Sequence, residues 1–157
     1  MIYIKYKILN IIPISIGVLG LIPYLIFFLN NFLNFYNLIH MMNLVLTYSS
    51  LLLSFMGAIY WGLGLRTVQY NDFAKKIKLE YFFIFSIVPF FLGMSFFIFE
   101  QKIGIIFLIL GFTFCQIIDE YIYFNIMIMK WYMILRRILT VIVVSNLIYC
   151  YIKSSYY

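Results

Sequence analysis

The chain has 157 residues, of which 66% are hydrophobic and only 10% are charged, and its net charge is +6. A typical soluble domain is about 25% charged, so this chain has too few charges to coat a globular surface. Composition therefore excludes an ordinary soluble protein and predicts a single integral membrane domain over residues 1–157. The basic residues lie in short segments between apolar stretches, which favours a role in membrane topology and not in binding nucleic acid.

The first predicted span covers residues 8–29, an apolar stretch that follows Lys5 and Lys7. It is too long for the apolar core of a signal peptide, so we predict a retained transmembrane helix. Pro23 is expected to kink its outer part, because proline has no N–H for the helix. Residues 30–42 are rich in asparagine, and we predict that they connect the first two spans as a short interfacial helix.

The second predicted span, residues 43–65, has no charged residue and is long enough to cross a hydrocarbon core of ~30 Å. Small residues recur along it, and those four positions apart fall on one face of a helix. Such a face lets a second backbone approach closely, as helices do in lipid. The predicted helix-packing residues are Ser50, Ser54, Gly57, Ala58, Trp61 and Gly62. Another span of the same chain is the favoured partner, and a separate subunit is the alternative.

The third predicted span is separated from the second by the most polar segment of the chain, residues 66–79. This span covers residues 80–99 and has Pro89 and Gly93 near its middle. Proline within a helix is a common cause of bending, so we expect a kink there.

The fourth predicted span covers residues 103–118 and is ended by Asp119 and Glu120. The fifth covers residues 134–152. Trp131 precedes it at the depth where amphipathic aromatic rings anchor a helix to the membrane interface. The chain is thus expected to cross the membrane five times.

Five spans place the two termini on opposite sides of the membrane. Of the eleven Lys and Arg residues, nine then fall on the side of the N-terminus, and only Lys102 and Lys153 fall on the other. The positive-inside rule assigns the richer side to the cytoplasm, or to the matrix of a mitochondrion. The predicted fold is therefore an all-α bundle of five transmembrane helices with its N-terminus on the cytoplasmic or matrix side.

Residues that carry chemistry are scarce in this sequence. His40 is the single histidine, so the chain cannot supply two histidine ligands to a haem, and no set of residues has the spacing of metal ligands. Cys115 and Cys150 lie in separate apolar spans. Glu80, Glu100, Asp119 and Glu120 fall at predicted span ends, whereas proton-coupled transporters place acidic residues inside the membrane. We predict no catalytic residue, no cofactor and no metal.

A polar cluster is predicted on the inner side, where Arg66, Asp119, Trp131 and Arg136 lie at similar depth at the ends of three spans. If these helices adjoin, Asp119 can pair with Arg66 or with Arg136, which would specify the order of the helices. An ion-pair clip is the favoured interpretation. The alternative is a site for an anionic ligand or a lipid headgroup, with Trp131 as one wall.

The motif LSFMGAIYWGLGLR, residues 53–66, resembles the glycine–tryptophan signature of a small family of membrane proteins that includes transmembrane protein 69. Four further elements resemble the family in the same order along the chain: GVLGLIPY (17–24), SIVP (86–89), Asp119 and WYMILRRILT (131–140). Ala58, Ile59 and Tyr60 depart from the pattern, which has a second glycine and often histidine before the tryptophan. The resemblance implies a five-helix inner-membrane protein of bacteria or mitochondria, and it implies no known reaction.

A non-catalytic accessory or scaffold subunit of a respiratory-chain or other energy-transducing complex is the function we expect, because the chain is small and its loops are short. Its partners would be membrane lipids and other membrane subunits. Abundant Phe, Tyr, Ile and Asn indicate AT-rich codons, which favours the mitochondrial inner membrane over a bacterial inner membrane. The alternative is a small-solute or lipid transporter, suggested by the kinks expected at Pro23 and Pro89. A membrane enzyme is the least favoured class.

Overall fold

A computed structural model describes residues 2–33, 35–70, 79–126 and 130–154. Helix is the only regular secondary structure in these ranges. The helices are α1 (Ile2–Leu19), α2 (Ile22–Leu33), α3 (Leu38–Tyr70), α4 (Leu79–Ile98), α5 (Gln101–Ile126) and α6 (Lys130–Lys153). The described chain has five stretches long and apolar enough to cross a membrane: Ile11–Leu33, Leu38–Arg66, Glu80–Ile98, Gln101–Phe124 and Lys130–Lys153. The predicted fold class, all-α with five spans, is confirmed.

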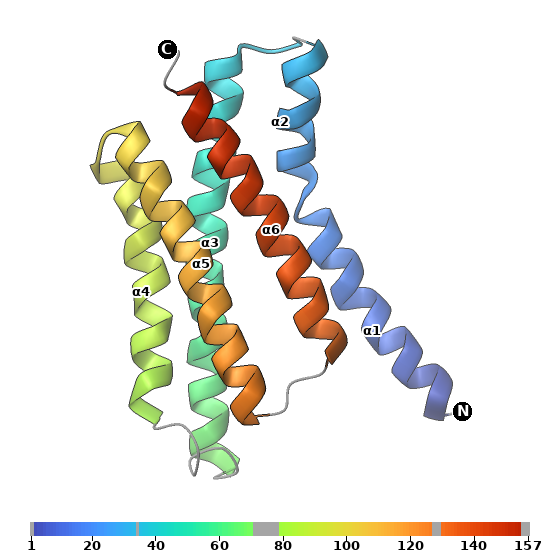
Figure 1. The fold of residues 1–157 in the computed structure, drawn as a ribbon. Helices are drawn as coiled ribbons and strands as arrows, with labels where there is room; N and C mark the ends of the chain where they lie inside the picture. Colours follow the sequence, from blue (N-terminus) through green and yellow to red (C-terminus); the bar gives the residue numbers. More distant parts are fainter. Residues whose placement is uncertain (1, 34, 71–78, 127–129, 155–157) are drawn as a thin grey trace.

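The first span is interrupted between α1 and α2, at Gly20 and Leu21. Figure 1 shows the two helices at an angle to each other. Pro23 follows directly and has no N–H to donate to the carbonyl one turn earlier, so the helix cannot continue unchanged. The hydroxyl of Tyr48 on α3 donates a hydrogen bond to the Gly20 carbonyl oxygen at 2.8 Å. A side chain from a neighbouring helix thus satisfies a backbone group in the break, which an apolar environment demands.

The connection between the first two spans is shorter than predicted. Residues 30–33 belong to α2 and residues 38–42 to α3, so the expected interfacial helix is not formed. The side chain of Asn30 accepts a hydrogen bond from the backbone N–H of Tyr36 at 2.8 Å and donates one to its carbonyl at 3.1 Å. Asn37 caps α3, because its side-chain oxygen accepts the N–H of Ile39 at 3.0 Å. These asparagines close a tight connection between two helices.

The fourth span is longer than predicted. α5 does not end at Asp119 and Glu120 but runs to Ile126, about two turns further. Asp119 is only 6% exposed, so it is not the solvated acid expected at a span end. An acidic residue can lie inside an apolar helix when a cation of a neighbouring helix neutralises it, and α6 provides that cation.

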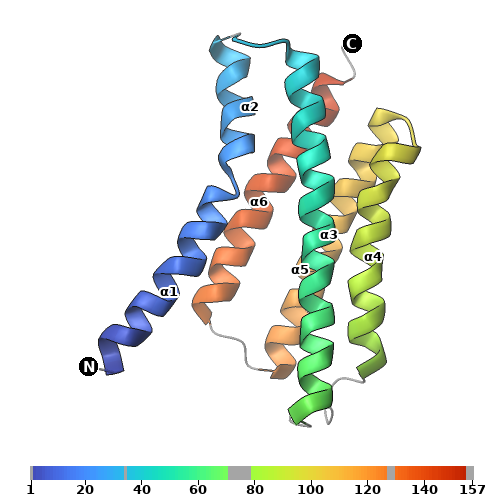
Figure 2. The same ribbon diagram turned by 180° about the vertical axis from the view of Figure 1, so that it is seen from behind.

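The helices form a bundle in which α3 packs against α4, α4 against α5, and α5 against α6. The first span completes it, since α1 packs against α6 and α2 against both α3 and α6. Figures 1 and 2 show the start of α1, the end of α3 and the start of α6 at one end of the bundle, with the C-terminus at the other. The largest fully buried side chains are Tyr24, Phe27, Leu46, Leu53, Tyr60, Phe82, Ile105, Leu108, Phe112, Ile122 and Met133.

Candidate functional site

The face of α3 that meets α4 is made of small residues seven positions apart. Ser50 is buried there, and its hydroxyl donates to the carbonyl oxygen of Gly93 at 2.7 Å. Gly57 lies so close to the carbonyl of Ser86 that a Cβ atom would overlap it. Gly64 is also buried, and a Cβ atom built on it would lie 3.2 Å from the Cβ of Phe82 on α4. Seven residues make about two helical turns, so all three positions keep facing α4.

The other predicted packing residues of α3 take different places. Ser54 donates to the carbonyl of Ser50 at 3.0 Å, and the ring of Trp61 packs edge-on against Phe83 of α4 at 4.8 Å. Ala58 and Gly62 are exposed, and a Cβ atom at Gly62 would meet nothing within 4 Å. Each step of four residues turns about 40° beyond a full turn, so a four-residue row leaves the face that begins at Ser50. Ala58 and Gly62 therefore lie on an exposed face of α3.

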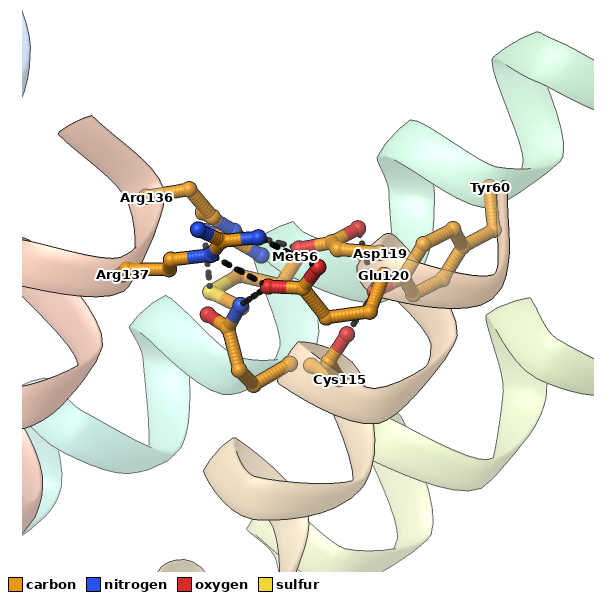
Figure 3. A network of polar contacts seen from close by, with 8 residues as sticks. Met56, Tyr60, Cys115, Asp119, Glu120, Arg136 and Arg137 are labelled. Atoms are coloured by element: carbon orange, nitrogen blue, oxygen red, sulfur yellow. Dashed lines mark hydrogen bonds and ion pairs between the residues drawn. The ribbon is translucent and has the colours of Figure 1, made fainter. Parts of the chain in front are cut away.

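A buried polar network joins α3, α5 and α6, and Figure 3 shows its side chains. Asp119 Oδ2 accepts a hydrogen bond from Arg136 Nε at 2.6 Å, and the two side chains are 8% and 12% exposed. The hydroxyl of Tyr60 lies 2.9 Å from both Asp119 Oδ1 and the Cys115 carbonyl oxygen. Arg136 Nη1 approaches the sulfur of Met56 at 3.1 Å. Both oxygens of the carboxylate therefore have a donor, which a buried charge requires.

Of the two partners left open for Asp119, the structure selects Arg136. Arg66 lies exposed near the end of α3, six residues or about 9 Å along the helix from Tyr60. Trp131 is half-buried, and its ring lies edge-on to Tyr132 at 6.1 Å. Neither residue belongs to the network of Figure 3.

Sequence reasoning missed Tyr60, Cys115 and Met56 as members of this network. A signal was available for one of them. Tyr60 lies within an apolar span, where a tyrosine hydroxyl needs a hydrogen-bond partner when it is buried. The carbonyl of Cys115 and the sulfur of Met56 carry no such signal, because they acquire a role only from their neighbours.

A second ion pair lies one residue further along both helices. Arg137 binds Glu120 through two contacts, Nε to Oε1 at 2.5 Å and Nη2 to Oε2 at 2.7 Å. The amide nitrogen of Gln116 adds a hydrogen bond to the same carboxylate at 3.0 Å. The Arg137 side chain is 51% exposed, because consecutive helix positions point about 100° apart. Two ion pairs of the same kind thus occupy a buried and an exposed environment side by side.

A cleft of about 260 Å³ lies between the first span, α3 and α6. It is lined by Gly17 and Gly20 on the first span, Leu52 and Met56 on α3, and Arg136 and Thr140 on α6, among others. A second hollow of about 310 Å³ between α1 and α6 shares Gly17 and Arg136 with it. Arg136 is therefore a wall of both spaces as well as the partner of Asp119.

The possible protein ligands for a metal in the described part of the chain are its His, Cys, Asp and Glu side chains. No group of three or more His, Cys, Asp or Glu side chains gathers there in a way that could hold a metal ion. Cys115 and Cys150 are buried free cysteines on α5 and α6. The polar network is therefore the candidate site that the geometry supports.

A family model with the description "Protein of unknown function (DUF3429)" matches residues 10–152. The match reaches from the first span into the last and includes every residue of the polar network. No curated protein and no solved structure matches the chain.

Proposed function

We propose a function for this chain, which belongs to the DUF3429 family: it is a non-catalytic accessory or scaffold subunit of a larger membrane complex. The complex we propose is a respiratory-chain or other energy-transducing assembly of the mitochondrial inner membrane, with a bacterial inner membrane as the alternative location. The abundance of Phe, Tyr, Ile and Asn, which are encoded by AT-rich codons, supports the mitochondrial location. We also propose that the ordered motifs around residues 53–66 relate the chain to proteins such as transmembrane protein 69.

The observation that carries the proposal is the outer face of α3, the longest helix of the described chain. Ala58 and Gly62 are exposed on it between the larger side chains of Phe55 and Leu65, which are 64% and 53% exposed. Figure 2 shows α3 across the front of the bundle. Small residues on a membrane helix allow a second helix to approach closely. A helix of a partner subunit is therefore the occupant that we propose for this face.

Native mass spectrometry after extraction in a mild detergent tests the proposal. We expect the spectrum to show the chain in a stoichiometric complex with other membrane subunits. Gly62→Leu should release it from the complex and leave its own fold intact, because Gly62 is exposed and a Cβ atom at this position would meet nothing within 4 Å. Thr113→Leu is the matched control, since Thr113 is exposed on α5, and it should leave the complex unchanged. A wild-type chain that migrates as a free monomer or homodimer would contradict the proposal.

A small-solute or lipid transporter is the second candidate, and the cleft beside the interrupted first span favours it. Movement of one segment of a broken helix against the bundle is a way to alternate access to such a space. Transfer of a fluorescent lipid between the leaflets of proteoliposomes measures this activity. A rate equal to that of protein-free vesicles speaks against lipid transport.

A further inference from the structure

We propose that the cleft between the first span, α3 and α6 binds one anionic phospholipid, with an acyl chain in the cleft and lipid oxygens on Arg136. The cleft is about 260 Å³, roughly the volume of nine water-sized groups, so it accommodates a short stretch of a single chain. This inference does not depend on the function proposed above.

The lining of the cleft selects a hydrocarbon occupant. Leu52 and Phe55 of α3 and Leu139 and Val143 of α6 are among its lining residues. All four residues lie well inside predicted membrane spans, where water is absent and the neighbouring molecules are lipids. The interrupted first span contributes to the opening, since Gly20 at the break is part of the lining. An acyl chain entering sideways from the bilayer fits these walls.

Arg136 supplies the polar end of the site. Arginine has five N–H donors, and the structure gives this one hydrogen bonds to Asp119 through Nε and to Met56 through Nη1. Its side chain is only 12% exposed, and it lines both the cleft and the adjoining hollow. No Arg136 nitrogen is buried without a partner, so its donors that are not bound to Asp119 or Met56 open onto these spaces, where lipid ester or phosphate oxygens can accept from them. The remaining donors of Arg136 thus define where the head of the lipid lies.

The position of Arg136 along α6 agrees with the depth of a lipid head. It lies six residues from Lys130, the first residue of α6, or about 9 Å along the helix axis. The α6 sequence places a cation at Lys130, Arg136 and Arg137, within its first eight residues. The positive-inside rule puts this end of α6 on the cytoplasmic or matrix side, where basic pockets between membrane helices favour anionic headgroups. Asp119 and Glu120 neutralise Arg136 and Arg137, so the positive excess at this end comes from its other basic residues, such as Lys130, and it favours an anionic phospholipid over a zwitterionic one.

The first test measures lipid retained by the full-length protein after purification in a mild detergent. Native mass spectrometry should show one bound phospholipid when phosphatidylglycerol is added, and less with phosphatidylcholine of the same acyl chains. Leu52→Trp fills the cleft and should lower the bound fraction about tenfold. Leu110→Trp is the matched control, because Leu110 is 53% exposed on the outside of α5, and it should retain the lipid. An equal loss of bound phospholipid in both variants, or no loss of it in Leu52→Trp, would overturn the proposal.

The second test removes the polar end without leaving a buried charge unpaired. The double variant Arg136→Met with Asp119→Leu replaces the ion pair by apolar side chains, which proteins commonly tolerate. It should lose the preference for phosphatidylglycerol over phosphatidylcholine while its thermal unfolding stays cooperative. Inorganic phosphate, added without lipid, should neither bind nor displace the lipid. A preference that persists in the double variant, or a phosphate adduct in the absence of lipid, would show that the site is not the one proposed.

Discussion

At the scale of single residues, the two neighbouring ion pairs of α5 and α6 show what burial does to a charge. The side chains of Asp119 and Arg136 are almost fully buried, whereas those of Glu120 and Arg137 are partly exposed. A buried ion pair adds little net stability, because desolvation offsets the attraction between the charges. Substitution of one partner alone lowers the stability strongly, because the other charge is then buried without a counter-ion. The Asp119–Arg136 pair therefore selects one arrangement of α3, α5 and α6 rather than adding much to their stability.

The residue-scale prediction concerns Asp119→Asn. This change leaves the Arg136 guanidinium buried without its counter-ion, so we expect a loss of about 3 kcal/mol in the free energy of unfolding. Glu120→Gln changes the adjacent residue in the same way, yet it should have little effect because that pair is exposed. Unfolding in mixed micelles, followed by tryptophan fluorescence, measures both. Equal losses in the two variants would mean that Asp119 does not act as an interhelical clip.

At the scale of the elements, the contact between α3 and α4 depends on glycine in a way that differs along one helix. Gly57 meets the α4 backbone directly, whereas Gly62 lies one and a half turns away on the outer face. Close approach of two backbones is a source of helix association in lipid, where the hydrophobic effect does not drive helices together. The same residue type is thus required at one position and optional at the other.

The element-scale prediction compares Gly57→Ala with Gly62→Ala. The methyl group at Gly57 overlaps the carbonyl of Ser86, so α3 and α4 must separate, at a cost of about 1–3 kcal/mol. At Gly62 the methyl group has open space and should leave the free energy of unfolding the same or raise it by up to about 1 kcal/mol. Thermal unfolding in detergent distinguishes the two variants. A Gly57→Ala protein as stable as wild type would contradict the close contact.

At the scale of the whole molecule, the bundle separates the basic residues between its two ends. Arg66, Arg136 and Arg137 lie towards the end where α1 begins, and Lys102 and Lys153 lie at the other. An odd number of spans puts the two termini on opposite sides of a membrane. The positive-inside rule then suggests a cytoplasmic or matrix location for the N-terminus.

The prediction at this scale is the location of the two termini. A reporter fused after Tyr157 should be found outside the cytoplasm or matrix, and the same reporter fused to the N-terminus should be found inside. Protease protection in sealed vesicles measures both. Finding both reporters on one side would require an even number of spans, and exchange of the two locations would reverse the proposed orientation.

The amino-acid sequence alone was enough to predict the class of the fold and the number of apolar spans. Both follow from the length and composition of each segment, which are local properties of the chain. It also identified Asp119 and Arg136 as members of a polar cluster, because charges near the ends of apolar spans are conspicuous.

Which of these groups meet depends on how the helices are assembled. The choice of Arg136 over Arg66 as the partner of Asp119, the hydrogen bonds of Tyr60, and the exposure of Gly62 depend on how each helix is rotated against its neighbours. In an almost uniformly apolar chain, hydrophobic periodicity does not define a buried face, because every face can meet lipid. Close packing of small residues and a few buried polar contacts set these rotations, and they exist only once the helices are assembled.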